Sequence, residues 1–284
     1  MLPGVESGDV KAVHRARVAS RRLRELVPVL QLERDTAQKL RKRLKKATRQ
    51  LGALRELDVL LELTDELLKS GRHAEHALRR VASDVRKARD GARRKVRSRN
   101  LAGDFKRVLK YAEKAGRQLP KTEDGNAARA WKWAIDARVA RRASSLKSAI
   151  AKAGAIYLPA RVHGVRIALK KLRYGVELLG EATGADVKSD LRALKRVQRL
   201  LGRLHDVQVL VDRVRHVQAS LNPPDIVAWK DLDLLVIALD QNCRRLHARY
   251  VSERGGLVAM CDRFAARVES TPRAAAARRA AGGR

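Results

Sequence analysis

The stretch VHRARVASRRLR at residues 13–24 returns, with changes, as VHGVRIALKKLR at residues 162–173. The match extends over 18 positions at an offset of 149, and eight of these positions carry the same residue in both copies. The histidine and the basic residues that follow it keep their spacing. A match of this kind within one chain predicts an internal duplication, so we expect two equivalent helices in two related halves.

Each copy is predicted to form a helix with an apolar face and a cationic edge. On a helical wheel the apolar residues of the first copy span about 140°, as expected of a face that packs on a core. They are Val13, Ala16, Ala19, Leu23, Leu26, Val27 and Leu30. Basic residues occupy a neighbouring arc of about 80°, so their side chains can act together on one extended anion. They are His14, Arg17, Arg21 and Arg24 in the first copy and His163, Arg166, Lys170 and Arg173 in the second, with Arg22 and Lys171 farther round as weaker candidates.

A second cationic stripe recurs at an offset of 150 with i, i+3, i+4, i+7 spacing. It consists of Lys42, Lys45, Lys46 and Arg49 in the first half and Arg192, Lys195, Arg196 and Arg199 in the second. Apolar residues on the opposite face of each helix are predicted to be buried, namely Leu40, Leu44, Ala47, Leu51 and Leu54, and Leu194, Val197, Leu201 and Leu204. A single basic stripe is usually a solvated face, but like charges that repeat without acidic neighbours favour the binding of an external anion.

Each stripe leads into a third shared element, LGALRELDVL at residues 51–60 and LGRLHDVQVL at residues 201–210. Its glycines, Gly52 and Gly202, lie inside predicted helices, and close helix packing is the simplest reason for them. Glu56 and Asp206 fall near the cationic edge, where we expect them to act as counter-ions that hold arginines of the first helices.

The composition points to a polyanionic partner. The chain has 64 Lys and Arg against 31 Asp and Glu, a formal net charge of +33, whereas solubility needs a magnitude of only about 2 to 8. Single-stranded nucleic acid would favour aromatic stacking platforms, but aromatic residues make up 3% of the chain. Apart from Tyr174 the basic face has none, and Trp131 and Trp133 are expected to pack on another helix. Non-specific binding of duplex DNA or RNA through phosphate contacts stays an alternative.

The periodicity predicts an all-α fold. Helices are expected at about residues 9–30, 33–68, 73–115 with an interruption near 100–103, and 127–152 in the first half, and at about 160–180, 185–221, 226–251 and 256–270 in the second. The predicted boundaries are an N-cap at Asp9, an end near Pro28, a stop at Ser70-Gly71 and a break at residues 222–225. Four helices in each half suggest two four-helix bundles related by a pseudo-twofold axis. Residues 271–284 have no core-forming pattern and are expected to be a disordered tail.

Signs of catalysis, metal binding or export are weak. The sequence has no glycine-rich phosphate loop and no cysteine-rich metal pattern, and the pair His73 and His76 is expected to be solvated surface. Cys243 and Cys261 are expected to be buried thiols. We therefore predict no catalytic residue, no metal and no cofactor. His14 and His163 stay open as acid–base groups, although the surrounding cations disfavour their protonated form and suit neutral donors to phosphate. Without a secretory signal or an apolar stretch that spans a membrane, we expect a cytoplasmic protein.

The sequence resembles the CHAD family, the conserved histidine α-helical domain. The resemblance rests on the motif that begins at His14, on the element LGxLRExDV at residues 51–59 and on their second copies. The resemblance covers about residues 10–267 and implies one domain at residues 1–270, made of repeats at about 9–152 and 156–270. It also implies a duplicated helical fold with a basic central groove that binds inorganic polyphosphate, lined by the histidine helices and the stripes named above. Family members can associate with polyphosphate granules.

Family members are often fused to a CYTH triphosphatase domain, but the sequence lacks its Glu-x-Glu-x-Lys motif, so we do not expect that activity. In the second half Leu204-His205-Asp206 replaces Leu54-Arg55-Glu56, and Gln208 replaces Asp58. The two halves therefore need not bind equally.

Overall fold

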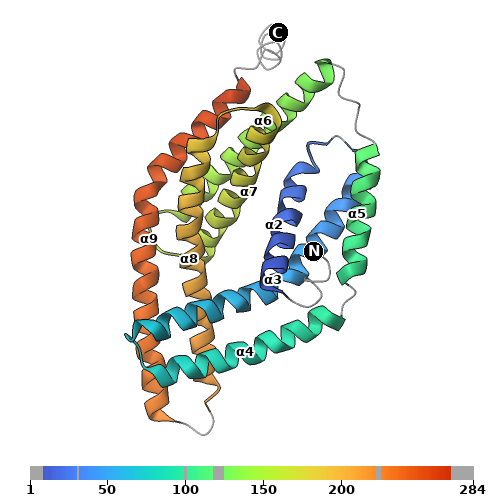
Figure 1. Cartoon of the computed structure of the whole chain (residues 1–284). Helices are drawn as coiled ribbons and strands as arrows, with labels where there is room; N and C mark the ends of the chain where they lie inside the picture. Colours follow the sequence, from blue (N-terminus) through green and yellow to red (C-terminus); the bar gives the residue numbers. More distant parts are fainter. Residues whose placement is uncertain (1–8, 31, 99–100, 118–124, 222–224, 270–284) are drawn as a thin grey trace. The chain divides into compact units, whose positions relative to one another are not determined.

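The computed structural model describes residues 9–30, 32–98, 101–117, 125–221 and 225–269, and these residues form eight α-helices and no strand. The helices are α2 (Val10–Leu26), α3 (Arg34–Ser70), α4 (Glu75–Ser98), α5 (Leu101–Arg117), α6 (Gly125–Ala153), α7 (Pro159–Thr183), α8 (Lys188–Ala219) and α9 (Ile226–Glu269) (Figure 1). The all-α prediction is confirmed. The predicted tail at residues 271–284 lies outside the described residues, and none of the described helices has the length and apolar character needed to span a membrane.

Local sequence signals set the helix ends where they were predicted. The backbone N–H of Ala12 donates to Oδ1 of Asp9 at 2.7 Å, so Asp9 caps α2. That helix ends at Leu26, two residues before Pro28. Gly71, with φ of 62°, follows the last residue of α3 in the left-handed conformation that glycine adopts without strain.

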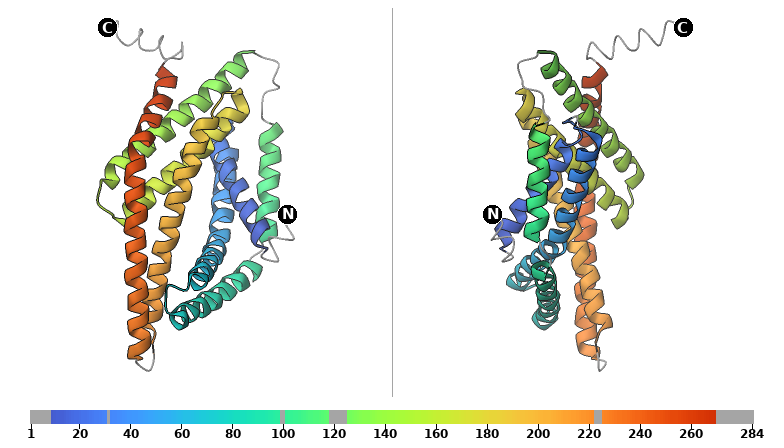
Figure 2. Two further views of the ribbon diagram at one scale, coloured as in Figure 1. Left: turned by 60° about the vertical axis from the view of Figure 1, so that its left-hand side comes forward. Right: turned by 90° about the vertical axis from the view of Figure 1, so that its right-hand side faces the viewer.

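The second half differs from the prediction at its C-terminal end. Two helices were expected there, at residues 226–251 and 256–270, but α9 runs without interruption from Ile226 to Glu269 (Figure 2). Gly255 and Gly256 are exposed inside it. Each glycine costs a helix about 1 kcal/mol relative to alanine, but side chains on both sides of the pair are buried and hold the helix in place. These include Tyr250, Leu257, Met260, Cys261 and Phe264.

The helices are also divided unequally along the sequence. Of the described helices, α2 to α6 belong to the first half and α7 to α9 to the second, so the halves contain five and three rather than four each. The long basic segment accounts for part of the difference, because it forms two helices, α4 and α5, separated at the expected interruption. The pseudo-twofold relation between two bundles stays a prediction.

The chain divides into two compact units, and each takes segments from both halves of the sequence. Unit 1 contains the described parts of Met1–Leu23, Gln38–Glu113 and Arg203–His247, and unit 2 those of Arg24–Ala37, Lys114–Gly202 and Ala248–Arg284. In unit 1 a core cluster joins α2, α3 and α5 through Ala12, Ala16, Ala47, Leu54 and Phe105, with Ala92 of α4 packed against it. In unit 2 the helices α6 and α7 pack extensively on each other.

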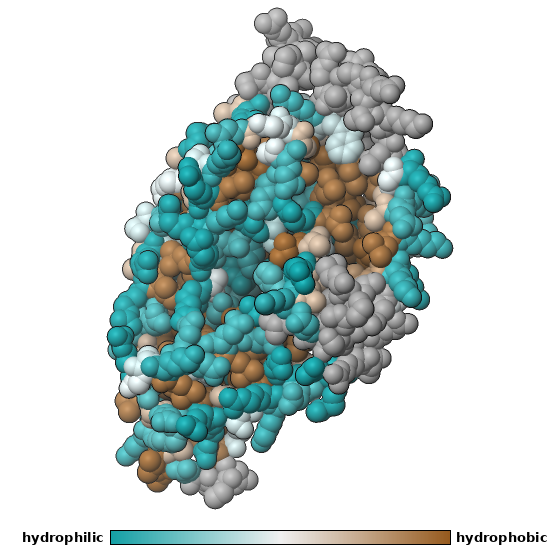
Figure 3. All heavy atoms as spheres, viewed as in Figure 1, coloured by the Kyte–Doolittle hydropathy of each residue, from teal (hydrophilic) through white to brown (hydrophobic). Residues whose placement is uncertain are grey.

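The predicted core faces are largely confirmed, with one exception on α2. On α3 the residues Leu40, Leu44, Ala47 and Leu54 are buried, and so are Leu194, Val197, Leu201 and Leu204 on α8. On α2, however, Ala19 is exposed and Ser20 is buried. The hydroxyl of Ser20 donates to the carbonyl of Ala16 at 2.8 Å, which lets a polar residue occupy the core face. Hydrophilic residues predominate along α8 and α9 on the face drawn in Figure 3.

The continuity of α9 can be tested at its glycine pair. Replacing Gly256 with Ala is expected to raise the free energy of unfolding by about 0.5–1 kcal/mol, because alanine favours a helix interior and its Cβ would meet open space. The matched control is Gly184→Ala, which is expected to lower it by about 1 kcal/mol since Gly184 has φ of 66°. Urea denaturation followed by circular dichroism measures both values. A loss of stability in Gly256→Ala would contradict an uninterrupted α9.

Candidate functional site

In unit 1 the first histidine helix contacts the stripe helix through an arginine. His14 is exposed on α2, and one turn later Nη1 of Arg17 donates to the carbonyl of Thr48 on α3 at 3.5 Å. The same nitrogen lies 3.2 Å from the position that a Cβ on Gly52 would occupy. Gly52 therefore makes room for a guanidinium group. At Gly202 the same position faces open space, so close helix packing does not explain the second glycine.

Several cations surround His14. Burial lowers the pKa of its imidazole, and the charges of Arg55, Arg17 and Arg21 lower it further, against a smaller opposite effect of Glu62. Arg55 was not among the predicted site residues, although it belongs to the shared element at residues 51–60.

The counter-ion in this region is not the one expected. Glu56 is exposed, and the carboxylate that pairs with Arg55 belongs to Glu62, at 2.9 Å. Both residues of this pair lie in α3, and the charge of Arg55 also acts on His14. The role predicted for Asp206 in the second half stays a prediction.

The second histidine helix has a similar environment in unit 2. His163 is half-buried on α7, and burial lowers its pKa, followed by the charges of Arg166 and Lys170. The expected direction is thus confirmed for both histidines, with burial as the larger cause. Neutral imidazoles can each donate one hydrogen bond and accept another.

The two stripes have acidic partners that come from other helices. Nζ of Lys46 lies 2.9 Å from the carboxylate of Asp104 on α5. At the matching position of α8, Nη2 of Arg196 lies 2.9 Å from the carboxylate of Glu253 on α9, and its hydrogen bond lowers the pKa of that carboxyl group. The sequence suggested that the stripes have no acidic partners, but one cation of each stripe pairs with a carboxylate. The compensated position is the same in both.

The remaining stripe residues are exposed cations. Within the part of the chain that the structure describes, none of them forms an ion pair with a carboxylate. They are Lys42, Lys45 and Arg49 on α3 and Arg192, Lys195 and Arg199 on α8. Three exposed charges in matching positions thus remain on each stripe helix, and each has donors that can reach an external anion.

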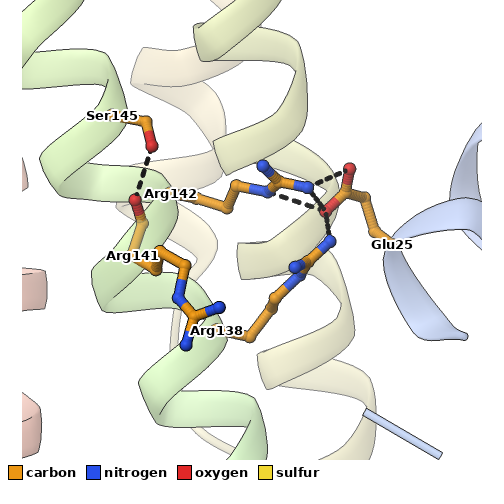
Figure 4. A network of polar contacts seen from close by, with 5 residues as sticks. All are labelled: Glu25, Arg138, Arg141, Arg142 and Ser145. Atoms are coloured by element: carbon orange, nitrogen blue, oxygen red, sulfur yellow. Dashed lines mark hydrogen bonds and ion pairs between the residues drawn. The ribbon is translucent and has the colours of Figure 1, made fainter. Parts of the chain in front are cut away.

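A cation cluster forms in unit 2 around a buried acid, Glu25, at the end of α2 (Figure 4). Arg142 of α6 donates to both carboxylate oxygens, from Nε at 2.8 Å and from Nη2 at 2.9 Å. Nη2 of Arg138 donates to the same carboxylate at 2.8 Å. Burial lowers the pKa of Lys171 on α7, as do the charges of Arg142, Arg24 and Arg138, while Glu25 raises it.

This cluster contains residues that the sequence analysis did not group together. Arg24 lies in the last turn of the first histidine helix, and Lys171, a weaker candidate by its wheel position, lies in the second. Arg138 and Arg142 were not predicted at all. Their helix has no counterpart at the offset of the repeat, so no duplication could mark them.

Other predicted residues have different surroundings. Arg173 donates from Nε to Gln198 at 2.7 Å, pairs with Glu177 and lies over the ring of Tyr174 at 4.2 Å, so internal contacts engage its guanidinium. Arg21, Arg166 and Lys170 are partly exposed, and Arg22 is exposed. Arg21 and Arg22 belong to unit 1, and Arg166, Lys170 and Arg173 belong to unit 2.

Of the residues assigned to structural roles, the two cysteines are buried as expected and Trp133 is not. Cys243 and Cys261 are buried free thiols, and burial raises the pKa of Cys261 to about 11. Nε2 of His76 lies 2.6 Å from a carboxylate oxygen of Asp231, and the described residues contain no group of three metal-ligating side chains. Trp133, expected to pack, is 39% exposed.

Comparison with known proteins places the chain in a family. Residues 2–215 match the CHAD domain family. The chain is also similar to the crystal structure of the CHAD domain from the plant Ricinus communis, with 19% sequence identity and a TM-score of 0.54, over 93% of this chain and 83% of that chain. Identity at this level shows the fold alone, and no curated protein matched the sequence. Because the family match covers well over half of its residues, the chain belongs to the CHAD domain family.

Proposed function

We propose that this protein binds inorganic polyphosphate and does not act on it as an enzyme. The cations of the histidine helices α2 and α7 and of the stripes on α3 and α8 would bind the phosphate groups of the polyanion. The observation that carries the proposal is the set of exposed stripe cations at matching positions of α3 and α8, which lack carboxylate partners among the described residues. Family membership supports it, because polyphosphate binding is a general property of CHAD domains.

The chemistry of the exposed residues suits a polyphosphate chain. Phosphate oxygens accept charge-assisted hydrogen bonds, which are shorter and stronger than neutral ones, and lysine and arginine supply the donors. The self-repulsion of a chain with a net charge of +33 weakens when an anion binds. Polyphosphate should therefore stabilise the fold. The same reasoning supports association with polyphosphate granules.

Nucleic acid is the alternative partner, and the surroundings of the basic residues favour polyphosphate. Stacking on aromatic side chains contributes about 1–3 kcal/mol per base to single-strand binding. The aromatic residue on the second histidine helix, Tyr174, is buried and covered by the guanidinium of Arg173. It therefore offers no stacking platform, and on this helix nucleic acid would have phosphate contacts alone.

Competition between the two polymers tests this choice. Polyphosphate is expected to displace fluorescent duplex DNA at a far lower concentration of phosphate groups than unlabelled DNA does, measured by fluorescence anisotropy. Displacement by unlabelled DNA at the lower concentration would contradict the proposal. Phosphate release in the same samples should not exceed that of the His14→Ala, His163→Ala double variant, and release above that level would indicate an enzyme.

The matched stripe positions give a second test. The double variant Lys45→Gln, Lys195→Gln is expected to weaken polyphosphate binding by about tenfold, because it removes one phosphate contact from each stripe. The charge-matched control Lys106→Gln, Lys110→Gln changes two exposed lysines on α5 and should alter the affinity by no more than about twofold at physiological salt. Isothermal titration calorimetry measures both. Equal losses in the two double variants would mean that net charge alone governs binding.

The histidines provide a pH-dependent signal. In the free protein the imidazole pKa values of His14 and His163 are expected below 6.5. Because the unfolded chain then binds protons more readily, acidification below about 6.5 should destabilise the free protein. Bound polyphosphate favours the imidazolium form and should raise both pKa values, which NMR titration of the ring protons follows. Values that do not move on binding would exclude these histidines from the site.

A further inference from the structure

The cluster around Glu25 holds more positive charge than its acid can offset. Arg138 and Arg142 both bind this carboxylate. The charges of Arg24, Arg138 and Arg142 also act on Lys171, and that of Arg141 acts on Arg138. The side chains of Glu25, Arg138 and Arg142 are 8%, 13% and 17% exposed. Partial burial strengthens the repulsion among the cations, since the surrounding medium screens charges less than water does. The cluster therefore favours a further anionic group.

The geometry of the arginines matches a phosphate group. Arg142 grips Glu25 through Nε and Nη2, one to each carboxylate oxygen. This two-pronged contact is the one that arginine also makes with two oxygens of a phosphate. In Figure 4 the guanidinium groups of Arg138 and Arg142 both point toward Glu25. The carboxylate thus occupies the position of a phosphoryl group between them.

One donor in the cluster is not used. Nε of Arg138 is buried and has no hydrogen-bond partner among the described residues. A buried donor without a partner costs about 1–3 kcal/mol. An oxygen of a bound anion would satisfy it, which is an indication of a ligand independent of the charge count.

The acid distinguishes the two copies of the histidine helix. The residue that matches Glu25 at the offset of 149 is Tyr174, which lies under the guanidinium of Arg173. The internal carboxylate is therefore a feature of the first copy. A phosphate that enters the unit 2 cluster has to compete with it.

We infer that Arg138 and Arg142 of α6 form, with Arg24 and Lys171, a phosphate subsite in unit 2 that Glu25 occupies until a phosphoryl group displaces it. The inference rests on the proposed function and adds residues of α6 to the binding surface. Arg138 and Arg142 are binding residues, and Glu25 is a positioning residue that keeps them in place and sets the affinity.

Affinity for tripolyphosphate tests the subsite. In the full chain Glu25→Gln is expected to bind it about tenfold more tightly than the original protein, because the internal competitor is lost, and Arg142→Gln about tenfold more weakly. Without ligand, Glu25→Gln should melt at a lower temperature, and tripolyphosphate should restore the loss. The matched control is Asp58→Asn, which removes a buried carboxylate that faces one arginine, Arg89, at 2.6 Å. Its melting temperature should fall, and tripolyphosphate should raise it by no more than it raises that of the original protein.

The outcomes separate this inference from the proposed function. If the original protein fails to bind tripolyphosphate or longer polyphosphate, the proposed function is wrong. If it binds, and Glu25→Gln and Arg142→Gln both keep its affinity, the subsite is wrong and the function stands. Should Glu25→Gln not fold, Arg142→Lys decides, since lysine keeps the charge and loses the two-pronged contact. It should weaken binding by about fivefold or more, and unchanged affinity would overturn the inference.

Discussion

Two buried carboxylates, Asp104 and Glu25, bind cations from other helices, and the arrangement of the candidate site depends on these contacts. Asp104 in unit 1 lies near Lys46, Arg43 and Arg107, and Glu25 in unit 2 binds Arg138 and Arg142. Transfer of an acid into the interior is unfavourable unless hydrogen-bonded cations compensate it. In a chain with a surplus of 33 positive charges, each such acid joins helices that would otherwise repel one another.

The positions of the carboxylates also determine which stripe cations stay available to a ligand. One residue in each stripe, Lys46 or Arg196, is tied to an acid from a distant helix, and the others stay exposed. The stripes are alike in this respect, whereas the ends of the histidine helices are not. Glu25 binds two arginines in the first copy, and Tyr174 supports Arg173 in the second. The duplication thus repeats the helix faces and changes the local contacts, which gives the two copies different chemistry.

Patterns within a single helix were predictable from the sequence. The apolar faces of α3 and α8 follow from the helical repeat, and the capping side chain of Asp9 and the turn at Gly71 mark helix ends through local backbone chemistry. The uninterrupted α9 was not predictable in this way, because the glycine pair weakens the helix locally while burial of flanking residues such as Tyr250 stabilises it. The burial of Ser20 was not predicted either, because its hydroxyl is satisfied by a hydrogen bond to the carbonyl of Ala16 in the same helix.

The candidate site was predictable only as far as it is repeated. Matched spacing identified the histidines and the stripes, but ion pairs between distant helices, such as Lys46 with Asp104, leave no spacing signal. Arg138 and Arg142 belong to a helix of the first half and have no matching residues at the offset of 149. The most direct test of the central claim is a crystal structure of the protein with bound polyphosphate. The account predicts phosphate oxygens within hydrogen-bond distance of the exposed cations on both α3 and α8, and phosphate bound away from both stripes would contradict it.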